Sequence, residues 1–254
     1  MKKILLAIAE FLSYFWYLIP RNLREKWITG WFILDSRGDP NVGLRQLLQL
    51  RDRLDWVINE RAMIFGDGTH PKHELIKYHQ FFIERINRSE SVLDVGCGYG
   101  AVSTSIACAH PDSTVVGIDY DVARLTLARN CTNIPNLQFV LGDATREVPA
   151  GKWDVVVLSN ILEHIDDRVA FLKKLNLTVT PKRYLIRVPM FERDWQMALR
   201  RELGVDFRSD PDHRIEYTIK EFREEIFESG LDFFEMQTIW GEIWAVCHIK
   251  EEME

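Results

Sequence analysis

The sequence is poor in several features that would assign it to other classes of protein. Its four cysteines stand far apart among 254 residues and form no C-x-x-C pair, which argues against a disulfide framework and a zinc site and fits a reducing cytosol. Its 32 lysines and arginines are outnumbered by 38 aspartates and glutamates, so it lacks the basic excess typical of nucleic-acid binding. It has no internal repeat and no low-complexity segment. Its length suits one α/β domain with an extension.

Glycines, by contrast, concentrate in SVLDVGCGYG at residues 91–100. The first half of this segment predicts a short apolar strand. Gly96, Gly98 and Gly100 predict a turn in which the backbone takes positive φ or comes close to a ligand. The alanine- and serine-rich stretch 101–110 predicts the helix that follows. A strand, a glycine turn and a helix N-terminus together present free N–H groups to a nucleotide-type ligand.

Three further apolar strands end in polar residues. They are predicted at 114–118, 136–141 and 153–158. Asp119 ends the first, 23 residues after Gly96, where a carboxylate grips ribose hydroxyls in folds of this kind. Asp143 follows the second strand and Asn160 the third. We therefore expect these side chains at one edge of the sheet.

Strands alternate with predicted helices, which implies a parallel sheet with right-handed crossovers. The helices are at 101–110, 121–131 and 167–175, a fifth strand is at 183–188, and a helix at 218–229 precedes a hairpin of 231–239 and 242–249.

With these residues in view, the chain resembles the class I S-adenosylmethionine-dependent methyltransferases, in their type 11/23-like branch with small-molecule and sugar acceptors. VLDVGCGYG is similar to their first motif, VVGIDYD to their second-strand acid, LGDA to their adenine-side acid and WDVVVLSNILEHI to their fourth strand. The resemblance runs from Ser91 to the C-terminus. It implies a Rossmann-like sheet of seven strands, mostly parallel with an antiparallel last strand.

The resemblance also implies S-adenosylmethionine as cofactor and S-adenosylhomocysteine as product. The predicted cofactor-binding residues are Asp94, Gly96, Cys97, Gly98, Gly100, Asp119, Tyr120, Asp143, Ala144 and Asn160. The glycines would approach the amino-acid part of the cofactor, and Asp94 would organise that loop or hold the ammonium group through water. Asp119 would bind the ribose, Asp143 the adenine amino group, and Asn160 would line the methyl-donor end. Each acid has the alternative role of a strand-end cap or turn former.

Two histidines, His164 and His213, are the candidate catalytic bases, because methyl transfer to oxygen can require removal of a proton near neutral pH. The alternative for either is a structural role. The ubiquinone-pathway O-methyltransferases carry E-x-x-E-H at this place and can bind a divalent metal. Here Asn160 replaces the first glutamate and leaves Glu163 beside His164, so we predict no required metal.

The insertion at 190–217 is predicted to form the substrate side of a methyltransferase domain that spans 89–254. It contains five arginines, Arg193, Arg200, Arg201, Arg208 and Arg214. They predict either a pocket wall for an acidic or sugar-phosphate substrate or a solvated helical flap. DPDHRIEYT resembles a segment of small-molecule and sugar methyltransferases in which the histidine faces the acceptor. We therefore expect a small-molecule acceptor, with a sugar or glycolipid intermediate as the finer hypothesis, and no nucleic acid.

Residues 1–88 are predicted as a helical extension. Its apolar start is interrupted by Glu10 and Ser13 and is too short to span a bilayer, which takes about 20 apolar residues. An aromatic-rich amphipathic helix at 3–19 with basic residues after it is typical of an interfacial anchor. Packing on the core or on a second subunit, as in a homo-oligomer, is the alternative. A signal peptide is disfavoured because no small-residue cleavage site follows. We expect a cytoplasmic protein, peripheral on the inner face of the membrane if this helix binds lipid.

The rest of the extension is predicted as a connector at 30–40, a helix at 42–64, a break at 66–71 and one helix at 72–86. His70, His73 and His79 near that break do not have a helix-face metal spacing. They serve either as capping and surface residues or in a lid over the site.

Two other functions are alternatives. A nicotinamide-dependent sugar oxidoreductase or epimerase predicts G-x-G-x-x-G and a Tyr-x-x-x-Lys pair, and the sequence has neither. A catalytically silent cofactor-binding scaffold at a membrane or partner surface has no need of both the glycine turn and Asp119. The acceptor atom and the oligomeric state are not specified by the sequence.

Overall fold

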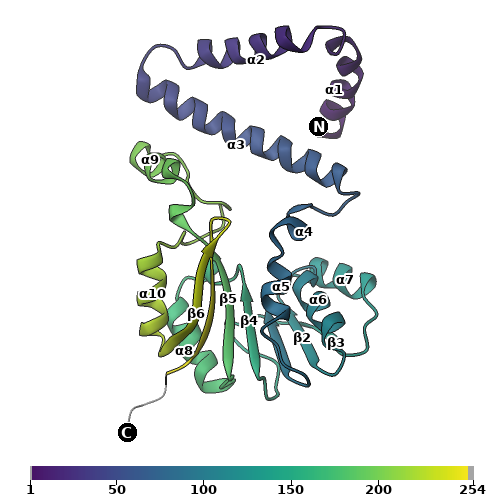
Figure 1. Cartoon of the computed structure of the whole chain (residues 1–254), viewed down its shortest axis with the longest axis vertical. Coiled ribbons are helices and arrows are strands. Elements are labelled where there is room, and N and C mark those ends of the chain that lie inside the picture. The colour runs from purple at the N-terminus through teal and green to yellow at the C-terminus, as the bar shows by residue number, and fades with distance from the viewer. Residues whose placement is uncertain (1, 251–254) are drawn as a thin grey trace. The chain divides into compact units, whose positions relative to one another are not determined.

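A computed structural model describes residues 2–250, with side chains from residue 8 onward. Its contacts divide into two units (Figure 1). One extends to Arg61 and includes Glu202–Val205, and the other comprises Ala62–Arg201 and the chain from Asp206 onward. Among residues 2–250 no helix has both the length and the apolar character that crossing a bilayer requires.

The first unit contains α1 (Lys2–Trp16), α2 (Arg21–Asp35) and most of α3 (Pro40–Phe65). The connector predicted at 30–40 is therefore wrong in its first half, because α2 continues through Gly30 to Asp35. Glycine costs a helix interior about 1 kcal/mol relative to alanine. The apolar residues Trp27, Trp31 and Leu34 keep helical spacing across it, and that periodicity predicts the observed helix better than the glycine predicts a break.

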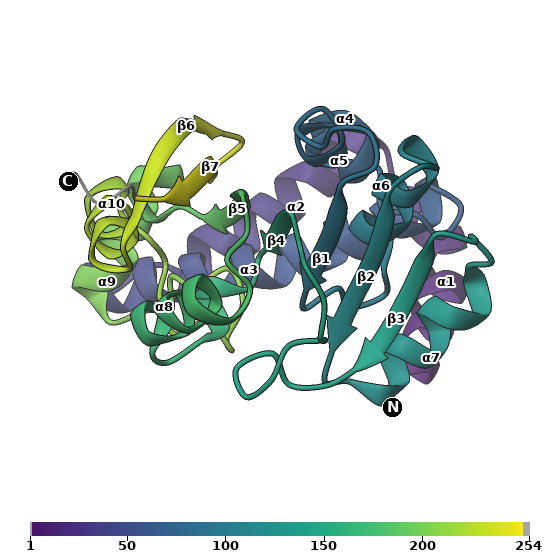
Figure 2. The same ribbon diagram turned by 90° about the horizontal axis from the view of Figure 1, so that it is seen from below.

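A seven-stranded sheet of order β3-β2-β1-β4-β5-β7-β6 forms the second unit. Its strands are β1 (Ser91–Val95), β2 (Thr114–Asp119), β3 (Leu137–Leu141), β4 (Val155–Ser159), β5 (Arg183–Pro189), β6 (Leu231–Ile239) and β7 (Glu242–Ile249). The first five pair in parallel, as Figure 2 shows for β1, β2 and β3. β7 runs antiparallel to both β5 and β6. The predicted mostly parallel sheet with an antiparallel last strand is confirmed.

Helices cover both faces of this sheet. Alternate residues of a strand point to opposite faces, and in β1 Val92 packs with the cluster that holds α5 (Tyr78–Ile83) and α6 (Ala101–Ala109). Leu93 packs with the cluster that holds α8 (Arg168–Thr178) and α10 (Ile219–Glu228). The remaining crossover helix, α7 (Val122–Cys131), begins at Asp121, whose side chain caps it by accepting from two backbone N–H groups. This double layer leaves the carboxyl ends of the parallel strands free for a site.

The single helix predicted at 72–86 is wrong in detail. The chain forms α4 (Lys72–Ile76) and then α5, separated by Lys77 in the left-handed conformation at φ 50°. After this break α5 buries Tyr78, Phe81 and Phe82 on the sheet, and burial of three aromatic side chains outweighs the local cost of one strained residue. Both helices belong to the second unit.

The three histidines near that break have local partners. His70 Nδ1 accepts from the Lys72 N–H, the Tyr78 hydroxyl lies 2.7 Å from His73 Nδ1, and His79 Nδ1 lies 2.7 Å from the Ser105 hydroxyl. None of the three lines the cavity described below. These contacts agree with a role as capping and surface residues near the break.

The insertion after β5 contains a short 3-10 turn, η2 (Phe191–Arg193), and α9 (Trp195–Leu203). It returns through a stretch of turns and irregular backbone whose end, Tyr217, bridges Met190. Arg193 pairs with Glu216 and ties the two ends together. A capping box of Thr218 and Glu221 then starts α10.

Candidate active site

A cavity of about 960 Å³ opens where the parallel strands end. It is lined by residues at or just after the ends of β1, β2, β3 and β4, by the start of α8 and by the insertion. The strand order reverses between β1 and β4, and ligands of open α/β sheets bind at such a switch point. The volume lies within the range of about 300–1,000 Å³ usual for small-molecule sites.

The glycine turn meets the cavity at Gly96, and each of its three glycines has a separate structural reason. Gly96 has φ 67°, and a Cβ there would lie 1.9 Å from Ile161 Cδ1. Gly98 has φ 55° with nothing within 4 Å of an added Cβ, and a Cβ at Gly100, φ 75°, would meet Phe139 at 2.4 Å. Positive φ is the common requirement. The space beside Gly98 is open, which suits close approach by a ligand.

Asp119 at the end of β2 fixes this turn. Its Oδ2 accepts from the Gly98 N–H at 2.8 Å and its Oδ1 from the Asp121 N–H at 2.8 Å. Each carboxylate oxygen can accept a second hydrogen bond. Asp119 therefore holds the turn and still has acceptor capacity on the cavity it lines.

Asp94 lies behind the turn and does not line the cavity. It is buried, and its carboxyl accepts from the Ser103 hydroxyl of α6 at 2.5 Å. Burial raises its pKa to about 7. This contact agrees with the predicted role in organising the loop.

Asp143 lines the cavity beside Ala144, as the adenine-side prediction requires. Its Oδ1 also accepts from the backbone N–H and the hydroxyl of Thr145. The hydrogen bond from the Thr145 hydroxyl is the main reason that the pKa of Asp143 lies below its usual value. Asp143 thus combines a turn-forming role with a place at the site.

Six of the ten predicted cofactor residues line the cavity, namely Gly96, Asp119, Tyr120, Asp143, Ala144 and Asn160. Asp94, Cys97, Gly98 and Gly100 do not. The Cys97 side chain lies against Gly117, where an added Cβ would be 2.8 Å from its sulfur, and burial raises the pKa of this thiol. The geometry supports an indirect role for these four residues, which maintain the shape of the glycine turn.

Asn160 follows β4 in a strained conformation. Its φ is 56°, and its N–H donates to the Arg187 carbonyl at 2.8 Å. Its side-chain Oδ1 is buried without a hydrogen-bond partner among the described residues. Strained residues and orphaned polar atoms gather at functional sites, and this one lies on the cavity at the predicted methyl-donor end.

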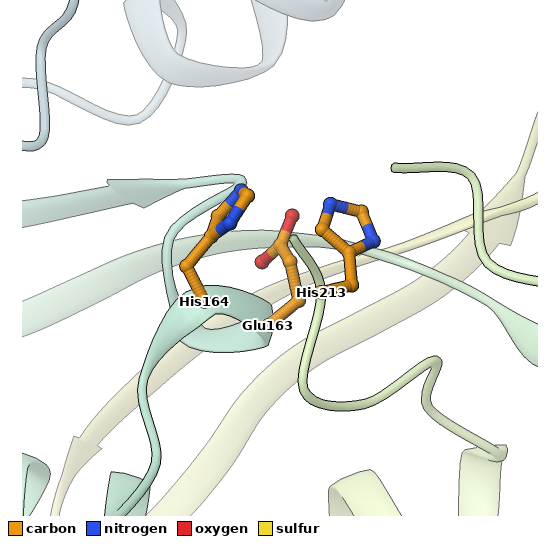
Figure 3. A group of neighbouring side chains, drawn as sticks. All are labelled: Glu163, His164 and His213. Carbon is orange, nitrogen blue, oxygen red and sulfur yellow. The ribbon is translucent and has the colours of Figure 1, made fainter. Parts of the chain in front are cut away.

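The two predicted catalytic histidines come together although 49 positions separate them in the sequence. His164 belongs to the short 3-10 turn η1 (Leu162–His164), and His213 comes from the insertion. Their ring centroids lie 4.6 Å apart at 81°, and Figure 3 shows the Glu163 side chain beside the two rings. The Arg214 N–H donates to the Glu163 carbonyl at 2.7 Å and holds the insertion against η1.

His164 is the histidine that meets the cavity. It lines the cavity, whereas His213 is buried behind it. Burial and the neighbouring His213 lower the pKa of His164 and outweigh the opposite effect of Asp210 and Asp212. A neutral imidazole at neutral pH is able to accept a proton.

His213 is held by a carboxylate. Its Nδ1 lies 2.8 Å from Glu216 Oε1, and Glu216 also accepts from Ser209 and pairs with Arg193. Burial alone would raise the pKa of Glu216, but the hydrogen bonds from His213 and Ser209 and the charge of Arg193 keep it below its usual value. Glu216 thus remains charged and fixes the orientation of the His213 ring.

Glu163 is fully buried, and among the described residues neither of its carboxylate oxygens has a hydrogen-bond partner. Burial raises its pKa to about 8. The side chain is therefore mostly protonated at neutral pH and offers a hydrogen-bond donor as well as acceptors.

One ligand atom each from Glu163, His164 and His213 lies within 4.8 Å of the others. A carboxylate and two imidazoles are a donor set that divalent ions such as zinc accept. The sequence did not predict this triplet as a set, because the position of His213 depends on the path of the insertion. The prediction of no required metal stays a prediction.

The five arginines of the insertion do not form the predicted cationic wall. Arg193 pairs with Glu216 and Arg208 with Asp206, Arg201 stacks on Phe191, and Arg200 donates to the Asp206 carbonyl. Only Arg214 lines the cavity, where it pairs with Asp166 at 3.0 Å.

Acidic residues that sequence reasoning missed lie on the same wall, namely Asp166, Asp167, Asp210 and Asp212. The only signal for the last two was their position beside His213 in DPDHR. Three cations also line the cavity, but Arg214 pairs with Asp166, Arg124 pairs with Asp121, and Lys174 donates to two backbone carbonyls. The remaining carboxylates make this wall unfavourable for an anionic group.

A family model described as a methyltransferase domain matches residues 68–234. Over 162 residues the chain is 34% identical to the ubiquinone biosynthesis O-methyltransferase of Vibrio parahaemolyticus, a match that covers 62% of this chain and 56% of that protein. Over 121 residues it is 34% identical to the trans-aconitate 2-methyltransferase of Methylobacterium radiotolerans, covering 48% and 44%. The chain thus spans about half the length of these curated relatives.

The fold is also similar to that of the solved DhpI–SAH complex, with a TM-score of 0.54 and 19% identity over 76% of this chain and 94% of that one. At this identity the likeness concerns the fold alone. The family match covers the glycine turn, the strand-end residues and both histidines. The chain therefore belongs to the methyltransferase domain family, as a class I S-adenosylmethionine-dependent methyltransferase.

Proposed function

We propose that the chain transfers a methyl group from S-adenosylmethionine to a hydroxyl group of a small-molecule acceptor. The observation that carries the proposal is the position of His164 on the cavity wall, with a lowered pKa and with His213 and Glu163 behind it. A neutral imidazole in this place is suited to take the proton of a hydroxyl acceptor.

The residues present fit the cofactor. Asp119 keeps acceptor capacity toward the cavity, the space beside Gly98 is open, and Asn160 Oδ1 has no hydrogen-bond partner among residues 2–250. Asp119 would hold the ribose hydroxyls and Asp143 the adenine amino group, while the glycine turn would approach the amino-acid part. When bound, the cofactor supplies an electrophilic methyl group on a sulfonium.

The protein's own residues align the acceptor, exclude water and move one proton. His164 accepts the hydroxyl proton. Its Nδ1 lies 3.6 Å from Asp212 Oδ2, so the carboxylate can stabilise the imidazolium that results. His213, oriented by Glu216, packs edge to face on His164 and fixes the position of that ring.

A neutral, polyhydroxylated acceptor such as a sugar or glycolipid intermediate is the finer proposal. The carboxylates of Asp166, Asp210 and Asp212 on the cavity wall are acceptors for several hydroxyl groups. The same charges disfavour a carboxylate or phosphate on the acceptor. The names of the relatives support a small-molecule acceptor, and one of them names transfer to oxygen.

The test is methyl transfer from labelled S-adenosylmethionine to a panel of small molecules. The panel pairs neutral sugars and glycolipids with phosphorylated or carboxylated counterparts. We expect label in the neutral hydroxylated compounds, and loss of that label in a His164→Ala variant that still binds S-adenosylhomocysteine. Transfer confined to acidic acceptors would contradict the finer proposal. Transfer that is unchanged in the His164→Ala variant would contradict the role of His164.

A further inference from the structure

The first two helices each carry an exposed apolar stripe. On α1, Ile8, Phe11, Leu12 and Phe15 recur at i, i+3, i+4 and i+7, so they share one face. Their side chains are 50%, 63%, 54% and 59% exposed. Within the described part of this helix, the polar Glu10 and Ser13 lie on the other side. The side chains that the structure describes therefore leave this stripe uncovered.

α2 repeats the arrangement in a stretch that was predicted to be partly connector. Leu23, Trp27, Trp31 and Leu34 follow one another at spacings of four, four and three, which again places them on one face. They are 42%, 53%, 71% and 66% exposed. None of the residues of α2, all of which the structure describes, is buried.

Such helices need a cover. An isolated helix of about 15 residues is marginal in water, and most helical stability in proteins comes from burial of an apolar face. α1 and α2 meet through a contact of Trp16 with Trp27, whose ring centroids lie 6.3 Å apart. That contact leaves both stripes exposed.

The aromatic residues identify the kind of cover. Tyr14, Tyr17 and Trp31 are about 70% exposed, and Arg24 stacks on the Tyr17 ring. Tyrosine and tryptophan rings with an apolar body and a polar tip are enriched at membrane–water interfaces. Neither helix meets the requirement for crossing a bilayer, so each would lie in the interface plane.

Charge separates the two parts of the chain. Residues 1–61 carry ten lysines and arginines against seven aspartates and glutamates, whereas residues 62–254 carry 22 against 31. An anionic lipid surface attracts the first part and repels the second. Pairing of the N-terminal unit with the same unit of another copy would bring two net positive charges together.

We propose that α1 and α2 form a docking surface for an anionic lipid bilayer, with the stripes Ile8–Phe15 and Leu23–Leu34 in the interface. This surface is independent of the acceptor and of the methyl-transfer chemistry. Because both units belong to one chain, it would tether the active site to the membrane.

The experiment is sedimentation of the full chain with vesicles of phosphatidylcholine, with and without about one third phosphatidylglycerol. We expect pelleting with the anionic vesicles that weakens with salt. Phe15→Glu and Trp31→Glu should each lower the partition coefficient about 10-fold or more, because each replaces a large apolar side chain that the lipid would bury with a charged one. The matched control is Leu177→Glu, at an 84% exposed leucine of α8, which should not change the partition. Binding of S-adenosylhomocysteine by every variant checks the fold.

Three results would overturn the proposal. They are no pelleting with either vesicle, pelleting that the two stripe variants do not change, and a lipid-free dimer that Phe15→Glu and Trp31→Glu dissociate. The last result would assign the stripes to a second copy of the chain.

Discussion

His164 and His213 lie edge to face with ring centroids 4.6 Å apart, although the chain between them forms α8, β5 and α9. A positive charge on either ring makes protonation of the other ring less favourable. His213 is accordingly the second cause, after burial, of the lowered pKa of His164. The ring that meets the cavity is thereby kept neutral. The pair connects the end of β4 with the insertion, so the insertion affects the chemistry of the site as well as its shape.

Replacing His213 with glutamine should move the acidic limb of the pH–rate profile toward higher pH. The variant removes a group that lowers the pKa of His164, so a larger fraction of His164 is protonated at a given acidic pH. The measurement is kcat against pH. A fall in rate with no movement of the limb would mean that His164 is not the titrating base.

His164→Ala should lower kcat by about 10²- to 10⁴-fold, the usual contribution of a positioned general base. Affinity for S-adenosylhomocysteine should stay the same, because the predicted cofactor contacts lie on the strand ends and the glycine turn. Single-turnover transfer and calorimetric titration measure the two quantities. His248→Ala, in β7 and outside the cavity lining, is the control and should retain full activity.

Glu163→Gln should stabilise the protein more as pH rises. The pKa of Glu163 is raised from its ordinary 4.5 to about 8, so between these values the folded protein binds more protons than the unfolded chain. Its contribution to stability is therefore present below about pH 4.5 and is lost as pH rises toward 8. Glutamine does not titrate, so the difference in Tm, variant minus wild type, should grow by several degrees from pH 5 to pH 8. A difference that does not depend on pH would show that Glu163 is ionised in the fold.

Gly96→Ala should abolish cofactor binding, because its Cβ would lie 1.9 Å from Ile161 Cδ1 at a φ of 67°. Gly30→Ala is the matched control. Gly30 lies inside α2 with nothing within 4 Å of an added Cβ, so alanine there should stabilise the helix by about 0.5–1 kcal/mol. Calorimetry and thermal unfolding check both. Normal cofactor binding by the Gly96→Ala variant would show that the glycine turn is not part of the cofactor site.

Removal of divalent metal should leave transfer unchanged, as the replacement of the first glutamate of E-x-x-E-H by Asn160 predicts. The measurement is activity after dialysis against EDTA, followed by elemental analysis. Two results together would show that Glu163, His164 and His213 hold an ion. The wild type would lose activity and regain it with zinc, magnesium or manganese, and the Glu163→Gln variant would not regain it.

The strand-end residues could be predicted because a parallel sheet brings the carboxyl ends of its strands to one edge. Asp119, Asp143 and Asn160 each follow a recognisable apolar strand, and all three line the cavity. The sheet itself follows from the alternation of strands and helices. These features depend on local pattern and general topology.

Other features depend on tertiary contacts that no local pattern contains. The break at Lys77 arises because α5 turns its aromatic residues onto the sheet. Glu216 meets His213 through a turn held by Arg193 and Ser209. The arginines of the insertion suggested a cationic wall, but only Arg214 lines the cavity. Arg193 and Arg208 instead pair with Glu216 and Asp206, acidic residues of the insertion that are folded against them.

The most direct test of the central claim is calorimetric titration of S-adenosylhomocysteine into the wild-type chain and an Asp119→Ala variant. Asp119 holds the glycine turn through the Gly98 N–H and faces the cavity. Micromolar binding by the wild type that is lost in a folded variant is the predicted result. A folded wild type that does not bind would contradict the assignment of the cofactor site and would favour a scaffold without catalysis.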